Sequence, residues 1–488
     1  MKTSFWLASC GAALVLGSMM GSAPVHAETL RDALIAAYQS NPTLNAARAQ
    51  QRATDEGVPL ALADGRPNSQ AQAQYSENFL NPANAFTAPE RTVNATLNLN
   101  VPIYSGGSAR NAINAAKVRV DAGQADLRGT EASVFSNVVA AYMDVIRDEA
   151  IVGLQRQNVG VLDVNLQASS DRFEIGDLTR TDVAQSQARL AIARSDLQTA
   201  EANLIRSKET YIQLVGAAPG QLEPPPPLPN LPDAPDAAVF TALDDNPDLL
   251  AARERVEAAN FDVKSARGTR MPQVSLFTQG NYQNFLGTLG SSLFAGNFVQ
   301  QQSSAAAGVQ LTIPVYQGGR PGAQIRRAQA LSGQAIEQEI AVERSIIAQV
   351  RAAYASFNAS MQVIDSSQSA VDANALALEG VRAENSVGNR TVLDILDAER
   401  ELLNAQVQLV IARRNAYVAG FTLLATMGKA EARDLGLDGG VLYDPEINYQ
   451  RVRDKINDWD SDKNPVARST RTVDSPAQNA AVVGPPNQ

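Results

Sequence analysis

Two acidic residues, Asp394 and Asp397, have the spacing of side chains that act together. Residues three apart on a helix lie on one face, so both carboxylates would point the same way. Such a pair can attract cations, and paired carboxylates can also perform acid–base catalysis. An isolated pair of this kind is more often an ordinary solvated helix face. A catalytic pair would also need a concave pocket, whereas the acidic residues here fall on predicted helix surfaces.

The only cysteine, Cys10, and the only histidine, His26, both lie in a segment with the features of an export signal. A basic start, an apolar stretch and a small-residue cleavage site ending at Ala27 form that signal. We therefore predict that residues 1–27 are a signal peptide that is removed on export. The mature chain would then lack thiols, imidazoles and the usual zinc ligands. We expect no enzyme activity, cofactor or metal site.

An alternative reading of the export signal involves Cys10 itself. The segment LASC, which ends at Cys10, resembles a lipoprotein box and would place a lipid on that cysteine. We favour cleavage after Ala27, because the apolar run continues past Cys10 and a better cleavage site follows. The run is also too short, and too interrupted by Ser and Gly, to span a membrane as a helix.

The overall charge argues against a nucleic-acid partner. The net charge is −10, and no basic cluster stands out along the sequence. Neutralising phosphates requires Lys and Arg, so we expect no nucleic-acid binding. Aromatic residues make up only 5% of the chain, which favours long thin helices over a large globular core.

Long helices must position the acidic pair, and the sequence pattern that predicts such a helix occurs twice. Residues 176–216 and 388–428 each open with a glycine turn, and a constant shift maps Asp182 onto Asp394. Large residues recur every seventh position: Val183, Leu190, Leu197, Leu204 and Tyr211, then Ile395, Leu402, Leu409, Ala416 and Leu423. Small residues lie between them, which predicts a close-packed, left-handed coiled coil.

The segments before these hairpin arms are duplicated as well. Residues 107–174 and 319–386 are predicted to be helices with almost no proline, each on the order of 100 Å long. Asn-Pro pairs at Asn41 and Asn246 are helix-start signals, with Asn as the cap and Pro at the first helical position. The chain is thus an internal duplication.

Between these helices the hydrophobic period changes to two. From Arg91 to Ile103, apolar residues alternate with Thr and Asn, and residues 304–313 repeat the pattern. Their partner strands are predicted near residues 69–75 and 274–285. This alternation is typical of a transmembrane β-barrel, and equally of half a β-sandwich. The export signal and the scarcity of other strands favour the barrel.

Each second strand ends in a matched phrase, VPIYSGG or IPVYQGG, where we predict that strand becomes helix. Proline cannot donate to a β-ladder, and paired glycines allow a sharp redirection. Tyr104 and Tyr316 would lie at the periplasmic water–lipid boundary or pack at the bend. The transition residues are Pro102, Tyr104, Gly106, Gly107, Pro314, Tyr316, Gly318 and Gly319.

Four strands cannot close a barrel, and open strand edges are not tolerated in lipid. Closure needs about eight strands or more, so at least two chains must pool their strands. Three chains would give twelve strands, although the strand count does not fix that number.

Together, the duplicated NP helices, the two junction phrases and the tip motifs RFEIGDLTRTDV and SVGNRTVLDILDAE resemble the TolC-type outer-membrane efflux and secretion channels. The resemblance covers essentially residues 29–436. It implies a mixed α+β membrane protein: a trimeric, twelve-stranded transmembrane β-barrel continuous with a long periplasmic α-helical coiled-coil barrel. It also implies a Gram-negative outer membrane, a periplasmic adaptor (membrane fusion protein), and an inner-membrane transporter of the RND or ABC type.

The resemblance also implies roles for individual residues. Asp394 and Asp397 match aspartates that ring a pore constriction and favour cations. Arg390 and Asp182 match a closed-state latch, for which an ordinary surface ion pair is the plainer reading. Four tip residues would contact the adaptor: Gly176, Thr179, Gly388 and Thr391. Where relatives place a gating tyrosine this chain has Asn385, so the resemblance does not extend to that part of the latch.

The predicted order of the chain follows. After the signal at residues 1–27 come repeat 1 (28–216), a proline-rich connector (217–240), repeat 2 (241–428), a short equatorial tail (429–457) and a disordered C-terminus (458–488). We favour a passive duct for efflux or for type I protein secretion. A periplasmic adaptor would need a lipoyl-like β domain, which is not visible, and a coiled-coil scaffold would lack alternating strands.

Overall fold

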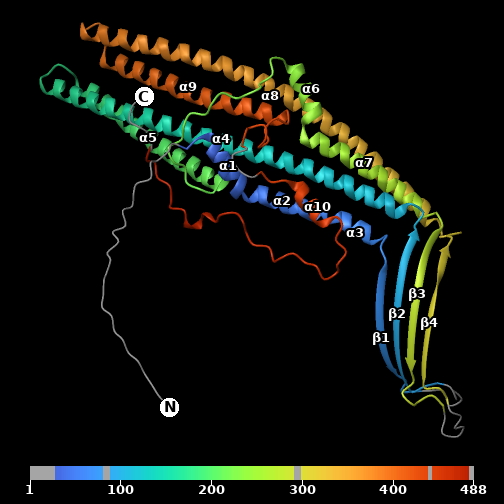
Figure 1. Cartoon of the computed structure of the whole chain (residues 1–488). Helices are drawn as coiled ribbons and strands as arrows, with labels where there is room; N and C mark the ends of the chain where they lie inside the picture. Colours follow the sequence, from blue (N-terminus) through green and yellow to red (C-terminus); the bar gives the residue numbers. More distant parts are fainter. Residues whose placement is uncertain (1–27, 81–87, 291–297, 438–441, 483–488) are drawn as a thin grey trace, which may run out of the picture.

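The structure, a computed structural model, describes residues 28–80, 88–290, 298–437 and 442–482. The predicted signal peptide, including Cys10, lies outside the described residues. A long helical body bends into a four-stranded sheet at one end, and two helical hairpins extend from the other end (Figure 1). Within the described ranges, none of the helices has both the length and the hydropathy needed to cross a membrane.

The elements occur in two matching series. The first contains α1 (Leu30–Ser40), α2 (Pro42–Asp55), α3 (Gly57–Ala63), β1 (Asn68–Glu77), β2 (Arg91–Tyr104), α4 (Ser108–Glu174) and α5 (Arg180–Val215). The second contains α6 (Pro235–Asp245), α7 (Pro247–Gly268), β3 (Gln273–Asn284), β4 (Gln301–Thr312), α8 (Arg320–Ser386) and α9 (Val392–Thr426). The short helix α10 (Pro445–Val452) and a 3-10 turn (Thr472–Asp474) follow. The predicted Asn-Pro starts are confirmed, since Asn41 and Asn246 cap α2 and α7 through their side chains.

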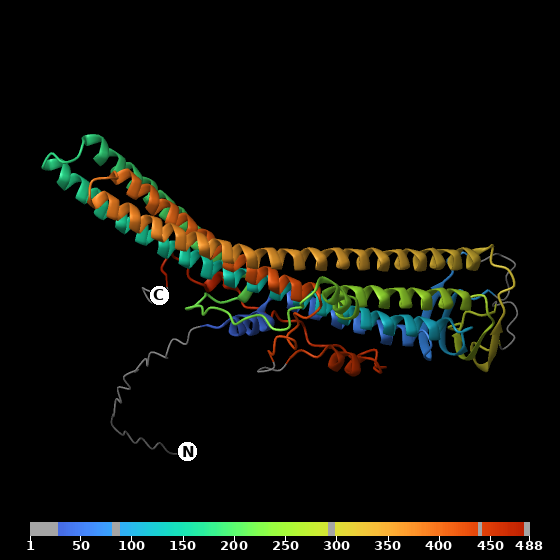
Figure 2. The ribbon, with the colours of Figure 1, turned by 90° about the horizontal axis from the view of Figure 1, so that it is seen from above.

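The two long hairpins pack through the predicted seven-residue seams. In α5 the seam residues Leu190, Leu204 and Tyr211 are buried, and in α9 Leu409 and Leu423 are buried. Helix α8 is exposed along most of its length, yet Val350 and Leu378 on its seam are buried. Figure 2 shows the hairpins α4–α5 and α8–α9 running side by side toward their tips. The heptad pattern therefore identified buried positions on α5 and α9, while its other positions there are partly exposed in the single chain.

The sheet is antiparallel throughout, in the order β1-β2-β3-β4. The register places Leu97 of β2 opposite Ala71 on one side and Gly280 on the other, so apolar and small residues share a face. Large residues on this face, such as Leu97 and Val309, are exposed in the single chain. Strands β1 and β4 both have an open edge, so the sheet is incomplete in one chain.

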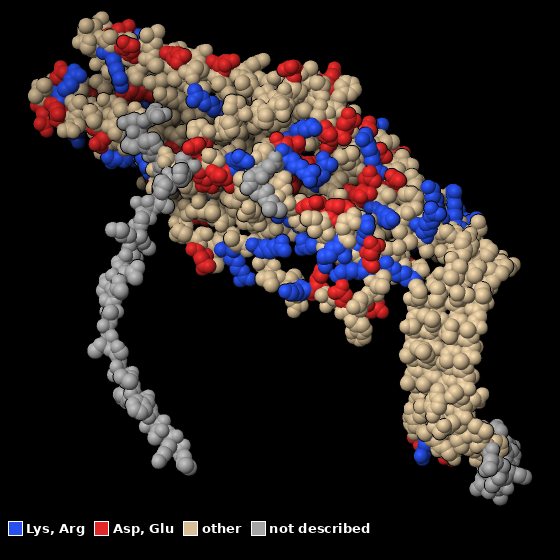
Figure 3. Space-filling view, viewed as in Figure 1, with Lys and Arg blue, Asp and Glu red and all other residues tan. Residues whose placement is uncertain are grey.

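Charge is almost absent from the four strands. Their only charged residues are Glu77 and Arg91, which form an ion pair of 3.4 Å at the loop end of the sheet. In Figure 3 the sheet is accordingly free of acidic and basic side chains until that end, whereas the helical body carries many of both signs.

The two strand-to-helix junctions differ. Strand β2 continues through Pro102 to Tyr104 with a register shift between these residues, whereas β4 ends at Thr312, before Pro314. Both glycine pairs have positive φ, at Gly106 and Gly107 and at Gly318 and Gly319. A β-carbon on Gly106 would also collide with the Gly268 carbonyl oxygen, whereas Gly318 and Gly319 have open space around them. The first junction therefore needs glycine for both conformation and room.

The largest buried cluster joins α1, the middle of α4, the C-terminal half of α5, and residues at and after the end of α9. Tyr142 lies in this cluster, and its hydroxyl is within hydrogen-bonding distance of the backbone oxygens of Glu223 (2.6 Å) and Glu28 (2.9 Å). The start of the described chain is thus tied to the proline-rich connector. This connector is extended as predicted up to residue 234, and then forms α6.

The C-terminal segment, for which the sequence predicts disorder, has specific contacts with the helical body. Residues 458–482 are almost without regular secondary structure, and Ala481 accepts a hydrogen bond of 2.7 Å from the buried Lys208. Arg156 donates to the Ala480 carbonyl oxygen at 2.8 Å. Val482 packs against the main buried cluster. The polar composition suggested solvation, but these side chains of α4 and α5 give the segment specific partners.

Candidate functional site

The tips of the two hairpins bring most of the predicted site residues together. Helices α4 and α8 end at glycines with a left-handed backbone, Gly176 (φ +84°) and Gly388 (φ +83°). Their β-carbon positions face open space, so these glycines serve the turn rather than a close contact. In both copies the next helix begins within a few residues. The tips are therefore tight, exposed and nearly identical.

Threonine and aspartate cap both tip helices in the same way. Thr179 donates from its backbone N (2.9 Å) and its hydroxyl (2.7 Å) to Asp182 Oδ2, and the Asp182 backbone N donates back at 3.3 Å. Thr391 and Asp394 repeat this at 2.8, 2.7 and 3.3 Å. Each pair is a capping box, with aspartate in place of the usual Glu or Gln. The predicted latch acid Asp182 and the predicted ring acid Asp394 are thus equivalent residues with the same local role.

These hydrogen bonds favour the ionised carboxylates. The Thr179 side chain, followed by its backbone N–H, holds the pKa of Asp182 below its ordinary value. For Asp394 the backbone N–H of Thr391 contributes most to the lowered pKa, followed by the threonine hydroxyl and then by Arg390. Both tips therefore keep a negative charge well into the acidic range.

Arg390 lies within its own tip. Its Nε donates to Glu384 Oε2 at 2.7 Å, and its Nη1 is 3.9 Å from Asp394 Oδ1. Both of its ion pairs in the described chain are therefore local, and the predicted pairing with Asp182 stays a prediction for neighbouring chains. Asn385, at the position of the missing tyrosine, donates from Nδ2 to the Arg390 carbonyl oxygen at 2.7 Å. The asparagine thus fastens the turn itself.

Asp397 has a partner that sequence reasoning missed. Arg189 on α5 donates from Nη2 to Asp397 Oδ1 at 2.7 Å, which joins one hairpin to the other. The Asp397 side chain is 60% exposed and that of Arg189 is 29% exposed. The second predicted ring carboxylate is therefore neutralised within its own chain. No short-range sequence signal marks this pair.

Glu399 forms a second connection between the hairpins, and it was also missed. Only 8% of the residue is exposed. Its Oε1 accepts a hydrogen bond from Arg382 Nη2 of α8 at 2.8 Å, and its Oε2 accepts one from Asn165 Nδ2 of α4 at 3.1 Å. An apolar cluster of Leu162, Leu190, Ala193 and Leu396 lies beside it. We call the two connections, Arg189–Asp397 and Asn165–Glu399–Arg382, the inter-hairpin clasp.

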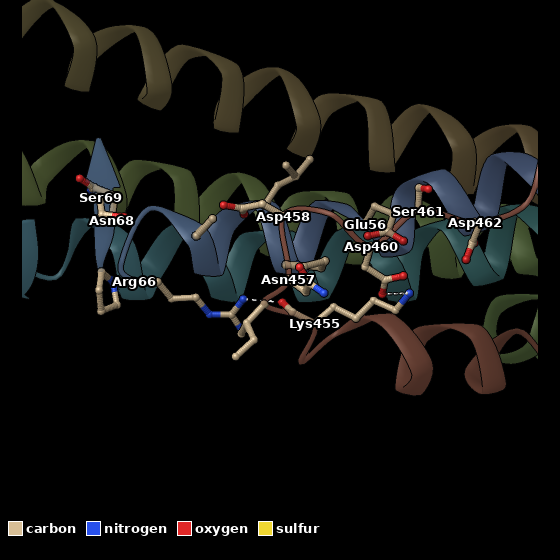
Figure 4. Close-up of a pocket in the computed structure, with 15 residues that line it drawn as sticks. Glu56, Arg66, Asn68, Ser69, Lys455, Asn457, Asp458, Asp460, Ser461 and Asp462 are labelled. Atoms are coloured by element: carbon tan, nitrogen blue, oxygen red, sulfur yellow. Dashed lines mark hydrogen bonds and ion pairs between the residues drawn. The ribbon is translucent and has the colours of Figure 1, made fainter. Parts of the chain in front are cut away.

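Two hollows accompany these features, at opposite ends of the body. One of about 500 Å³ lies between the hairpins and is lined by Asn165, Arg382 and Glu399 of the clasp. The other, of about 640 Å³, lies beside the start of β1, where Arg66 donates to the Lys455 carbonyl oxygen at 2.6 Å and Lys455 pairs with Asp460 at 2.7 Å (Figure 4). Its cations are already engaged by the tail, so it reflects packing of that segment. Within the described ranges, no group of three His, Cys, Asp or Glu residues is placed to hold a metal ion.

Comparison with known proteins agrees with this arrangement. The Outer membrane efflux protein family matches residues 34–217 and 239–429, that is, both repeats. The outer membrane efflux protein BepC of Brucella suis is 33% identical over 444 residues, covering 91% of this chain and 94% of that protein. The outer membrane protein TolC of Vibrio cholerae is 26% identical and covers 85% of this chain and 94% of its own length.

The fold is likewise shared with a solved channel. The CmeC outer membrane channel of Campylobacter jejuni superimposes with a TM-score of 0.73 at 16% identity, over 88% of this chain and 90% of that one. The family consists of channels rather than enzymes. On the extent of the family match and the identity to BepC, the chain belongs to the outer membrane efflux protein family.

Proposed function

We propose that this protein is the passive exit duct of a tripartite export system in the outer membrane of a Gram-negative bacterium. Three chains would pool their strands into a twelve-stranded barrel, with the helical hairpins reaching into the periplasm. The observation that carries the proposal is the four-stranded sheet: it is nearly free of charge, exposes its apolar face, and has two open edges. In lipid such a sheet requires closure by further copies.

The hairpin tips would form the periplasmic entrance. Gly176, Thr179, Gly388 and Thr391 shape their exposed turns, which offers a contact surface to a periplasmic adaptor. Docking of the adaptor and of an RND or ABC transporter would separate the tips, while the transporter supplies the energy. The proposal covers both efflux and type I protein secretion, because one duct can serve either cargo.

The clasp would hold the entrance closed. Swinging α8–α9 away from α4–α5 breaks Arg189–Asp397 and Asn165–Glu399, but leaves Arg382–Glu399 intact within its hairpin. Separation would free Asp397 from its arginine, so that the charge at the constriction becomes more negative as it opens. The rings of Asp394 and Asp397 would then favour cations in a narrow aqueous pore. Hydrogen bonds and ion pairs that form in the closed arrangement but not in the open one can make such a tip switch between two states.

The test is conductance of the purified protein in a planar bilayer. Wild type should give a small, cation-selective conductance, and Asp394→Asn with Asp397→Asn should weaken the selectivity. Asparagine at position 394 keeps an oxygen that can accept the hydrogen bond from the Thr391 backbone N–H, which limits damage to the tip. The charge-matched control is Glu379→Gln with Glu401→Gln, two exposed acids without a side-chain partner in the described chain.

Identical reversal potentials in the wild type and the aspartate variant would remove the carboxylate rings from the proposal. Well-inserted oligomers without any conductance would exclude the duct and favour a scaffold. Cell fractionation provides an independent check, since a duct should remain with the outer membrane after extraction with salt.

A further inference from the structure

The fold gathers basic side chains at the junction between helices and sheet. Residues 64–67, 104–114, 266–273 and 313–328 form this junction and contain a single acidic residue, Asp64, while the C-terminal tail adds Asp458 and Asp460 beside Arg66 at the start of β1. The same stretches hold seven arginines, although the chain as a whole carries a net charge of −10. Figure 3 shows basic side chains concentrated directly beside the uncharged sheet. These residues are far apart in sequence, which is why no basic cluster was evident there.

Most of these arginines lack a partner within the chain. Arg66 donates to the Lys455 carbonyl oxygen, but the other six are exposed and have no side-chain hydrogen bond or ion pair within the described ranges. They are Arg110, Arg267, Arg270, Arg320, Arg326 and Arg327, and we call them the basic collar. Some exposed arginines elsewhere on the helices, such as Arg119, Arg255 and Arg156, are paired with acids, so what sets the collar apart is that its arginines gather in one place.

The guanidinium groups of two collar arginines, Arg270 and Arg326, lie close to the same position beside Gly322. A β-carbon on Gly322 would lie 3.3 Å from Arg326 Nη1 and 3.7 Å from Arg270 Nη2. Two guanidinium groups that share a point without an intervening acid repel each other, and an anion between them removes that repulsion. The planar fork of arginine donors matches the oxygens of a phosphate. The geometry therefore suits a phosphate group in particular.

The residues next to the collar are those of a membrane interface. Between the sheet and Arg320, the side chains of Ile313, Val315 and Tyr316 are 57%, 93% and 85% exposed. On the other junction Tyr104 is also exposed. Exposed aromatic and aliphatic side chains beside basic ones are typical of the boundary between hydrocarbon and headgroups.

We propose that the basic collar binds the phosphate groups of anionic phospholipids in the periplasmic leaflet of the outer membrane. The sheet sets the depth of the collar in the membrane, because its uncharged strands end where the collar begins. The exposed residues of the junction would enter the acyl boundary, and the collar arginines would contact the phosphates above it. This inference rests on the proposed position of the sheet in the membrane.

The experiment uses the full-length oligomer purified in detergent, with native mass spectrometry to count retained lipids. Phosphatidylglycerol and the zwitterionic phosphatidylcholine are offered in separate mixed micelles. The variant is Arg270→Gln with Arg326→Gln, and the control is Arg344→Gln with Arg351→Gln. The control arginines lie on α8, are exposed, and have no side-chain partner in the described chain, so the charge change is the same. Both variants must migrate as the wild-type oligomer.

Wild type and control should retain phosphatidylglycerol in preference to phosphatidylcholine. The collar variant should lose about 30-fold in phosphatidylglycerol affinity, as expected for two arginines at a lipid surface. Equal retention in variant and control would overturn the proposal. Displacement of the lipid by millimolar inorganic phosphate would also overturn it, since the site would then serve a free anion.

Conductance separates this inference from the proposed function. A collar variant with unchanged lipid retention and an altered reversal potential would place these arginines in the pore, which contradicts the lipid assignment but not the duct. Oligomers that retain phosphatidylglycerol through the collar yet never conduct would contradict the duct but leave the collar in place.

Discussion

Replacing Glu399 by glutamine is expected to shift the duct toward its open form. Glu399 is the buried member of the clasp, and its carboxylate accepts hydrogen bonds from Asn165 and Arg382. Glutamine keeps the size of the side chain but offers a single acceptor, and its amide would face one of the two donors. The closed arrangement therefore loses a charge-assisted bond that the open arrangement never makes.

The size of the shift toward the open form follows from the hydrogen bond between Asn165 and Glu399, which links the two hairpins. A hydrogen bond to a charged group contributes about 1.5–3 kcal/mol, and part of it survives through the remaining acceptor, so we take about 1.5 kcal/mol per chain. This corresponds to about a tenfold shift in the ratio of open to closed forms. In the proposed trimer a concerted opening would add three such terms, on the order of a thousandfold.

Single-channel recording in a planar bilayer measures this ratio directly as open probability. The control is Glu401→Gln, two residues along α9, where the side chain is exposed and has no partner in the described chain. Circular dichroism should give the same helix content for both variants. An open probability of Glu399→Gln equal to that of wild type and of Glu401→Gln would refute the clasp.

Three further predictions address the tips and the junction. Arg390→Ala and Asp182→Ala should each raise the closed-state conductance. Thr179→Ala, which removes the hydroxyl's part of the cap but keeps the carboxylate and its bond from the backbone N–H, should not. Unchanged conductance in both charge variants would exclude the latch. Because hydrogen bonds lower the folded-state pKa of Asp182, its stabilisation of α5 is complete above the ordinary carboxyl pKa of about 3.9 and is lost as pH falls through the lowered value. Amide exchange in the first turn of α5 should therefore accelerate only below about pH 4, and less so in Thr179→Ala, where only the backbone N–H bond to the carboxylate remains. Gly106→Ala should reduce the yield of folded oligomer, because Gly106 has a positive φ and its β-carbon would collide with the backbone of Gly268. The control Gly153→Ala, in the middle of α4 where the β-carbon meets open space, should be neutral or mildly stabilising. Equal yields of the two variants on a non-denaturing gel would contradict this account.

The helices and strands could be predicted from the sequence because their signals are periodic and local. The seam from Leu190 to Tyr211 repeats every seven residues, and the alternation from Arg91 onward repeats every two, so each pattern alone identifies the apolar side of its element. The bond between Arg189 and Asp397 has no such signal, because its members lie 208 residues apart. It depends on how two hairpins pack, which periodicity does not specify.

The tip motifs show the opposite case, because a local sequence signal, the capping box, is present there but does not enter the sequence-based prediction. Thr179 and Asp182, like Thr391 and Asp394, have the spacing of a capping box, and their hydrogen bonds have that geometry. The resemblance to TolC-type channels instead implies a latch role for Asp182 and a ring role for Asp394, and both roles depend on neighbouring chains. Both roles remain compatible with the cap, since one carboxylate oxygen of each residue is left for other contacts.

The C-terminal segment described above constrains the order in which the chain can fold. Lys208 donates a hydrogen bond to the carbonyl oxygen of Ala481, which is synthesised 273 residues later, and Arg31 donates one to the carbonyl oxygen of Gly436 across a separation of 405 residues. Contacts of such long range form slowly, because a large loop must close before they stabilise anything. The first repeat, although it contains a complete set of elements, therefore remains unfinished until nearly the whole chain has been synthesised. During that interval the faces of α1, α4 and α5 stay available to misfolding or to chaperones, so the duplicated halves do not mature as independent units.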